Sequence, residues 1–207
     1  MSVWFTSDLH FGHVNILKYT PQRREYLGLS DDADVNDMNE AIVELWNTQV
    51  APDDHVYVIG DVAMGKVQDT IEFVRQLNGK KFLTMGNHDR PHRIMHKTDE
   101  QTAEWTRVYN DVGFTIMPDT WETEFGGVLA KVCHFPYYGD HSEDRYNADK
   151  LAPYTPIETG MPLVHGHVHD LWKTRGGIMY NVGIDAWDGV FQTPEAIGDY
   201  FRANGFQ

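Results

Sequence analysis

The sequence contains a single cysteine, Cys133, among its 207 residues. One cysteine excludes an internal disulfide and any metal site built from several thiolates of the same chain. Long apolar runs are also missing, since no stretch approaches the ~18 to 20 residues that a membrane-spanning helix needs. The first residues, MSVWFTSDLH, lack the basic and apolar regions of a secretion signal. We therefore expect a cytoplasmic protein that does not bind membranes.

Basic residues are scarce: the chain has 17 of them against 31 acidic residues, and its formal net charge is -14. A surface of this sign repels polyanions, so we expect no non-specific binding to nucleic acid. A phosphorylated substrate would need a local reversal of this negative field. The hydrophobic fraction of 41% and the charged fraction of 23% are typical of a globular protein, and this length predicts one domain over residues 1–207.

Five short apolar runs end in side chains that can bind a metal ion. Such runs, rich in Val, Ile and Phe and bounded by Gly or Pro, favour strands over helices. In chain order they are VWFTSDLH, HVYVIGD, KFLTMGNHD, LAKVCH and PLVHGHVH.

Helical patterns separate the first three of these strands, at residues 38–45 and 67–77. Strand-helix alternation predicts an α/β sheet, whose functional groups gather beyond the carboxyl ends of its strands. Glycine pairs at 126–127 and 176–177 indicate two later hairpins with antiparallel strands. We therefore predict an α/β fold, a two-sheet ββ sandwich flanked by helices.

Two long segments could cover a site at these strand ends. Residues 92–110 carry a possible helix, whereas residues 135–160 are rich in Pro, Tyr and Asp and are expected to form a long loop. Whether 92–125 and 135–160 close over the site does not follow from the sequence.

The ordered blocks D-x-H (Asp8, His10), G-D (Gly60, Asp61), G-N-H-D (Gly86 to Asp89), a strand-end His134 and G-H-V-H (Gly166 to His169) form one pattern. It resembles that of the calcineurin-like metallophosphoesterase superfamily, and its spacing is more similar to small bacterial and phage-type phosphodiesterases. The protein Ser/Thr phosphatases of the superfamily have a glycine at the start of the first block, which SDLHFG lacks, and an arginine after the second block, which GDVAMG lacks. The pattern therefore argues against a protein phosphatase.

The resemblance implies two divalent metal ions. One would be held by Asp8, His10 and His169, the other by Asn87, His134 and His167, with Asp61 bridging both. It further implies that His88 protonates the leaving oxygen or steadies the phosphoryl group, and Asp89 would then orient His88 or its loop.

The chemistry of these ligands also stands without the family. Imidazole and oxygen donors without thiolate suit Mn, Fe, Zn, Co or Ni, of which we take Mn²⁺ as the working choice. Two such cations carry a charge of +4, whereas the carboxylates of Asp8 and Asp61 carry -2. The site would therefore be positive within a chain of net negative charge. Glycines at 60, 86 and 166 would let the backbone approach the metals without a Cβ in the way.

We therefore expect a phosphodiesterase that acts on a small nucleotide-like substrate, such as a 2',3'- or 3',5'-cyclic mononucleotide. A phosphomonoesterase, a nuclease supplied with a basic groove by a partner, and a non-catalytic metal-binding scaffold are the alternatives. The oligomeric state does not follow from the sequence.

Several further residues allow two interpretations. His13 and Arg90 are candidate substrate contacts, and Arg23 and Arg24 could hold phosphate oxygens, although surface arginines are commonly solvated. His165 is expected to be a buried structural histidine. The tyrosines Tyr137, Tyr138 and Tyr146 could stack on a base but are favoured as packing residues.

Two motif-like segments do not fit their motifs. GDVAMGKV imitates a phosphate-binding loop, but it has Val67 where Ser or Thr is needed. DDADVND imitates a calcium loop, and we interpret it instead as an acidic helix start before Met38.

Overall fold

The computed structural model describes residues 1–96, 98–139 and 148–207. Within these ranges nine strands form two sheets. The first sheet has the order β1-β2-β3-β4 and is parallel throughout. Its strands are β1 (Val3–Thr6), β2 (His55–Ile59), β3 (Lys80–Thr84) and β4 (Phe114–Ile116).

The second sheet is mixed and has the order β5-β6-β7-β9-β8. Its strands are β5 (Thr120–Phe125), β6 (Val128–Cys133), β7 (Leu163–His165), β8 (Thr174–Arg175) and β9 (Met179–Asn181). The two predicted hairpins are present, because β5 pairs with β6 and β8 with β9 in antiparallel fashion. In addition, β6–β7 and β7–β9 pair in parallel, which the hairpin pattern does not predict. The long connection after β6 returns the chain to the same end of the sheet, as parallel pairing requires.

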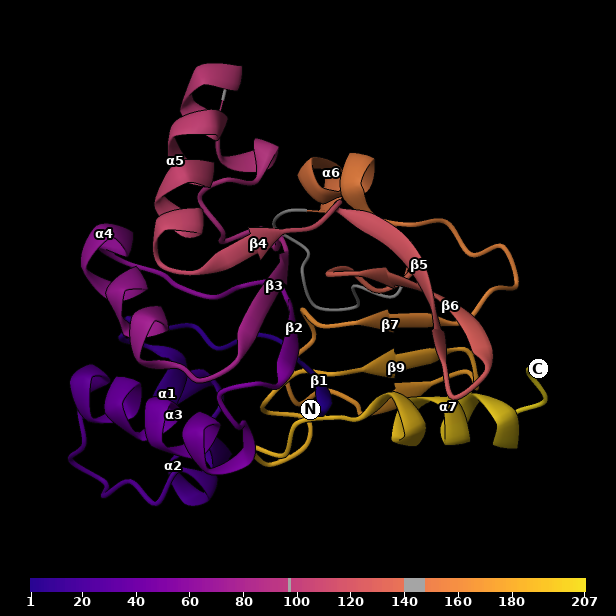
Figure 1. Cartoon of the computed structure of the whole chain (residues 1–207), viewed down its shortest axis with the longest axis horizontal. Coiled ribbons are helices and arrows are strands. Elements are labelled where there is room, and N and C mark those ends of the chain that lie inside the picture. Colours follow the sequence, from indigo (N-terminus) through magenta and orange to yellow (C-terminus); the bar gives the residue numbers. More distant parts are fainter. Residues whose placement is uncertain (97, 140–147) are drawn as a thin grey trace.

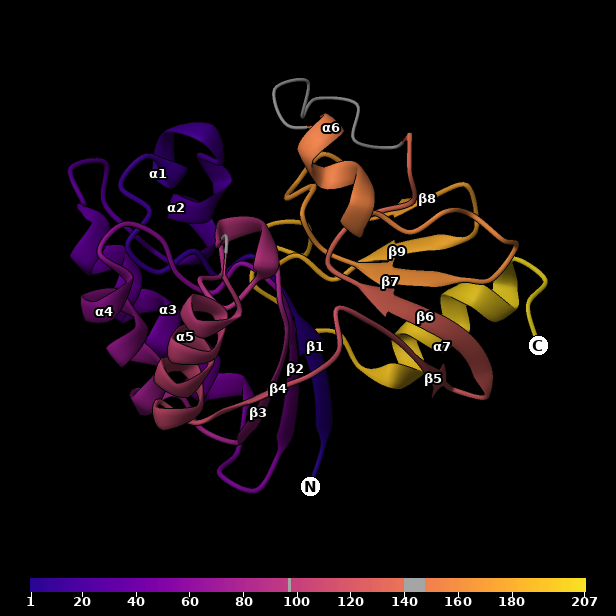
Figure 2. The same cartoon turned by 90° about the horizontal axis from the view of Figure 1, so that it is seen from above.

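Helices cover the outer face of the first sheet, whereas the second sheet packs on its inner face (Figures 1 and 2). The covering elements are α1 (Ile16–Tyr19), α2 (Gln22–Tyr26), α3 (Val35–Gln49), α4 (Val67–Thr70), the 3-10 turn η1 (Ile71–Gln76) and α5 (Asp99–Asp111). Met38, Ile42 and Trp46 of α3 are fully buried against Val56 and Val58 of β2. The apolar stripe read from the sequence therefore faces the sheet.

A second core joins the two sheets. Phe5 and Ile59 of the first sheet pack against Val132, Val164 and Tyr180 of the second. The C-terminal helix α7 (Pro194–Ala203) adds apolar side chains to this core. The predicted sandwich with flanking helices is therefore confirmed.

The helix ends explain where the sequence-based boundaries differ. Asp34 caps α3 in a reciprocal capping box with Asp37, which is the acidic helix start expected there. The pattern at 67–77 divides into α4 and η1, where Thr70 turns its hydroxyl back to the carbonyl of Met64. After the 3-10 turn η2 (Arg93–Met95), α5 begins only at Asp99, because Thr98 provides its cap.

The segment 135–160 is not a plain loop in its described part. It contains α6 (Ala148–Leu151) and the 3-10 turn η3 (Ala152–Tyr154), and Leu151 packs on Leu163 and Met179 of the second sheet. Tyr137 is buried there and donates its hydroxyl to the carbonyl of Met161 at 2.6 Å, so it packs as expected. Tyr138 is exposed, and Tyr146 lies outside the described residues.

Candidate metal centre

The candidate metal ligands come together at one edge of both sheets. Asp8 and His10 follow β1, Asp61 follows β2 and Asn87 follows β3. His134 follows β6, and His167 and His169 follow β7. Because the carboxyl ends of parallel strands meet at the same edge, residues more than 150 positions apart in the chain become neighbours.

The side chains form two groups that could each hold a metal ion. Asp8, His10 and His169 make the first group, and Asp61, His134 and His167 make the second, with the ligand atoms of each group within 4.8 Å of one another. Asp61 lies between them: its Oδ2 is 3.7 Å from His10 Nε2 and 3.5 Å from His134 Nε2. Asn87 Oδ1 is 3.3 Å from His134 Nε2, beside the second group.

The backbone carrying these ligands is in an unusual conformation. Positive φ angles occur at Asp8 (61°), His10 (53°), Asp61 (56°), His167 (72°) and His169 (48°). In the described residues Asp188 is the one other non-glycine position with such a φ. Left-handed backbone costs on the order of 1–2 kcal/mol per residue for a side chain with a Cβ. Strain concentrated at five ligand positions marks this edge as a functional site.

Glycines bring the ligand loops into contact. A Cβ on Gly86 would overlap the Asp61 carboxylate, and a Cβ on Gly60 would overlap the His134 ring. At Gly166 it would overlap Ser7 and the Asp8 carboxylate. The three glycines singled out in the sequence thus allow the backbone to approach the ligand side chains directly.

Two imidazoles are oriented by hydrogen bonds on their Nδ1 atoms. His134 Nδ1 donates to the carbonyl of Ile59 at 2.7 Å, and His169 Nδ1 donates to Asp185 Oδ2 at 2.8 Å. Each bond occupies Nδ1 and leaves Nε2 as the ring atom that a cation could bind in place of a proton. This arrangement is the usual one for a metal-binding histidine.

His10 provides the most direct test of whether this site fits a metal ion. Its side chain is buried, and neither ring nitrogen has a hydrogen-bond partner among the described residues. Burial lowers the pKa of His10 well below its usual value, so the ring is neutral, as a ligand must be. At His134 burial alone would lower the pKa, but the Asp61 carboxylate raises it to about 9, so a bound cation would displace the Nε2 proton there. The residues present therefore fit divalent cations bound by nitrogen and oxygen.

A buried ion pair between Arg23 and Asp185 holds in place the segments that carry the first ligand group. Arg23 donates to both oxygens of Asp185, at 2.8 and 2.6 Å, and also to the carbonyls of Asp8 and Leu9. Tyr26 donates its hydroxyl to Asp185 at 2.7 Å. Burial would raise the pKa of Asp185, but the Arg23 guanidinium lowers it strongly, so the carboxylate stays ionised.

These contacts change the interpretation of Arg23. It is fully buried, so it does not hold phosphate oxygens. Arg24 donates to the carbonyls of Ser30 and Ala33, and among the described residues it forms no hydrogen bond with the candidate ligands. Sequence reasoning missed Asp185, although it follows the apolar run that contains β9 much as Asp61 follows the run of β2.

Asp89 faces the backbone. Its buried carboxylate accepts hydrogen bonds from the N–H groups of Asp61 (2.8 Å), Val62 (3.0 Å) and Gly86 (2.8 Å). Burial and the charge of Asp61 raise the pKa of Asp89 to about 6. Its position is that of a group that orients the loops after β2 and β3, rather than one that reaches a substrate.

His88 and His13 lie beside the first ligand group. The centres of their rings are 5.6 and 5.4 Å from the centre of the His10 ring. The backbone N–H of His88 donates to Asp61 Oδ1 at 2.8 Å, and its side chain is half-buried. Burial, with a contribution from His88, lowers the pKa of His13 to about 4.

Two of the weaker candidates are not members of either ligand group. His165 is buried, with Nδ1 2.7 Å from the carbonyl of Gly166 and its ring against Trp172, as a structural histidine would be. Arg90 extends from the same loop as His88 and lies over the ring of Trp105 at 5.7 Å.

The two-sheet fold thus carries, at one edge, two neighbouring groups of side chains that could each hold a metal ion. A family model for calcineurin-like phosphoesterases matches residues 1–174, and the chain belongs to this family. It is therefore a metallophosphoesterase.

Similar proteins are found in phages. The chain is 31% identical to the Gene 66 proteins of Mycobacterium phages L5 and D29, over 90% of this chain and 87% and 89% of theirs. A solved structure of a protein of unknown function from Aquifex aeolicus is similar in fold, with a TM-score of 0.57 and 22% identity over 92% of this chain and 94% of that one. Among the described residues, no helix has both the length and the apolar character needed to cross a bilayer.

Asp185→Asn should weaken metal binding, because His169 loses the charged acceptor that fixes its tautomer. Changes in such supporting groups typically reduce metal affinity about 10- to 100-fold. Calorimetric titration of the metal-free protein with Mn²⁺ measures the effect. Asp188→Asn is the matched control, since Asp188 is exposed and pairs with Lys173 at 3.7 Å. An unchanged Mn²⁺ affinity in Asp185→Asn would show that Asp185 does not support metal binding through His169.

Asp89→Ala should destabilise the fold, because three buried N–H groups lose their acceptor. Each unsatisfied donor costs on the order of 1–3 kcal/mol, so we expect a loss of at least ~2 kcal/mol in the free energy of unfolding. Urea denaturation measures it, with exposed Asp31→Ala as the control. A variant of unchanged stability but without activity would instead place Asp89 in the chemistry.

Proposed function

We propose that this protein is a dinuclear metal-dependent phosphodiesterase that hydrolyses small nucleotide-like diesters, cyclic mononucleotides being the simplest examples. The observation that carries the proposal is the position of Asp61 between two ligand groups. A carboxylate shared in this way suits a bridging ligand between two ions.

The ligand roles follow from the two groups. Asp8, His10 and His169 would hold one ion, and Asn87, His134 and His167 the other, with Asp61 between them. When bound, two divalent cations lower the pKa of water and stabilise the attacking and leaving oxygens of an in-line displacement at phosphorus. Their charge also exceeds that of the two carboxylates, so an anionic substrate is attracted despite the net charge of -14.

His88 is the candidate general acid. Its backbone is held by Asp61, and its half-buried ring stands beside the His10 ring without being part of either ligand group. A ring nitrogen of His88 would carry the proton that the leaving oxygen takes as its bond to phosphorus breaks. His13, with its depressed pKa, would meet the substrate as a neutral imidazole. Arg90 would contact the substrate beyond the reacting phosphorus.

Two broader features belong to the same proposal. Residues 1–207 would act as one domain, which is supported by the apolar core between the two sheets. Mn²⁺ is the metal we would supply first. The cytoplasmic location expected from the sequence stays a prediction.

The direct test compares two substrates, bis(4-nitrophenyl) phosphate and 4-nitrophenyl phosphate, with manganese-loaded protein. We expect cleavage of the diester to exceed that of the monoester, and His134→Ala to abolish it because the second ligand group loses an imidazole. Preference for the monoester would contradict the proposal and indicate a phosphatase. Inactivity on both would favour the scaffold interpretation.

His88→Ala should retain the metal affinity of the wild type and lose rate, because the variant lacks the proton donor and keeps both ligand groups. General-acid catalysis is typically worth ~10²- to 10⁴-fold, and the loss should be largest for poor leaving groups. A series of aryl diesters with leaving groups of increasing pKa measures the dependence. Loss of metal from this variant would show instead that His88 is a ligand.

A further inference from the structure

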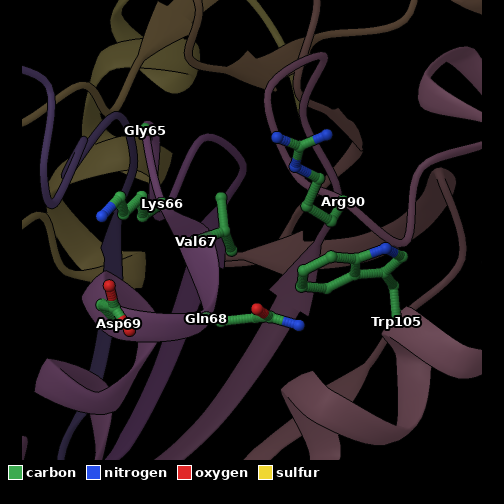
Figure 3. Close-up of a pocket in the computed structure, with 7 residues that line it drawn as sticks. All are labelled: Gly65, Lys66, Val67, Gln68, Asp69, Arg90 and Trp105. Atoms are coloured by element: carbon green, nitrogen blue, oxygen red, sulfur yellow. The ribbon is translucent and has the colours of Figure 1, made fainter.

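A second feature, a cleft with a volume of about 240 Å³, opens where the loops after β2 and β3 meet α5 (Figure 3). Its lining residues are Gly65, Lys66, Val67, Gln68, Asp69, Arg90 and Trp105. Complete ligand pockets usually measure ~300 to 1,000 Å³. A cleft of this size suits one part of a ligand.

The cleft carries two cations from separate elements. Lys66 stands on the α4 side, and Arg90 stands across from it above the ring of Trp105 (Figure 3). In the described part of the chain, neither side chain has a carboxylate within ion-pair distance. Asp69 is the one acidic residue in the lining, so the cleft has a net positive charge in a chain of net charge -14.

Trp105 gives Arg90 a defined position. The guanidinium carbon lies 5.7 Å from the centre of the indole ring, a cation–π distance. The backbone N–H of Arg90 also donates to the Tyr109 hydroxyl at 3.3 Å. A guanidinium held in this way presents its N–H groups as a planar fork, which matches the oxygens of a phosphate.

The cleft adjoins the metal centre along two short segments. Arg90 follows His88 by two residues, which span at most about 7 Å of chain. On the other side a Cβ added at Gly65 would lie 3.2 Å from the carbonyl oxygen of Gly12, the residue before His13, so these two backbone segments run close together. A substrate whose reacting phosphorus lies beside His88 and His13 can therefore extend into the cleft.

We infer that this cleft binds a second phosphate group of the substrate, with Lys66 and Arg90 as its contacts. The inference rests on the proposed function and narrows it to nucleotide diesters that carry an additional phosphate. A cyclic mononucleotide, with its single phosphate, would leave both cations unused. Lys66 and Arg90 are thus specificity-determining residues for the diesterase.

The test uses two substrates that differ by one phosphate: thymidine 5'-(4-nitrophenyl phosphate) and the same compound with a 3'-phosphate. For manganese-loaded wild type we expect kcat/KM to be about tenfold or more higher with the 3'-phosphate, the effect of one or two charge-assisted hydrogen bonds. In Arg90→Gln and in Lys66→Gln the ratio of the two kcat/KM values should fall toward one, mainly because KM for the substrate with the 3'-phosphate rises. Arg93→Gln, which removes an exposed arginine paired with Asp99, should keep the wild-type ratio.

The outcomes separate this inference from the proposed function. A ratio near one in the wild type, or variants that slow both substrates equally, would overturn the second-phosphate site while the diesterase stands. If neither substrate is cleaved, the diesterase fails. Calorimetric titration with thymidine 3',5'-bisphosphate then tests phosphate binding in the cleft. The affinity of the protein for this bisphosphate should fall about tenfold in Arg90→Gln and in Lys66→Gln and stay unchanged in Arg93→Gln. Equal affinity in all three would overturn the inference.

Discussion

The guanidinium of Arg23 joins the segments that carry one half of the candidate metal centre. It binds the backbone carbonyls of Asp8 and Leu9 and both oxygens of Asp185. Asp185 in turn holds the ring of His169. A fully buried arginine is unfavourable unless its charge is compensated, so the loops after β1, β7 and β9 are constrained to meet around it. The positions of the first ligand group follow from this one buried ion pair.

The second half of the centre is organised by a carboxylate in place of a guanidinium. Asp89 gathers three backbone N–H groups from the loops after β2 and β3, and thereby sets the place of Asp61. The Arg23–Asp185 ion pair and the Asp89 carboxylate hold the loops that carry the ligands, and neither occupies a position among the ligand atoms themselves. They hold left-handed backbone at Asp8 and Asp61 that would otherwise relax, and this explains how strain is retained at the functional edge.

The candidate ligands named from the sequence come together at one edge of the sheets, because a polar residue that directly follows a buried strand lies at the sheet edge. The sequence predicted the sandwich for a similar reason, from the periodicity of its strands and helices. It did not reveal the pairing of Arg23 with Asp185, since 162 residues separate them and an arginine in a sequence is normally assigned to the surface. The parallel pairing of β6 with β7 and the cleft beside Trp105 likewise depend on tertiary packing between distant segments.

The most direct measurement of the central claim is the number and coupling of the bound ions. Metal-free protein would be dialysed against Mn²⁺, its metal content measured by mass spectrometry, and its electron paramagnetic resonance spectrum recorded. A centre in which Asp61 is shared by both ligand groups predicts two ions per chain and the multiline spectrum of an exchange-coupled pair. One ion per chain, or two ions with the spectrum of isolated Mn²⁺, would contradict the account.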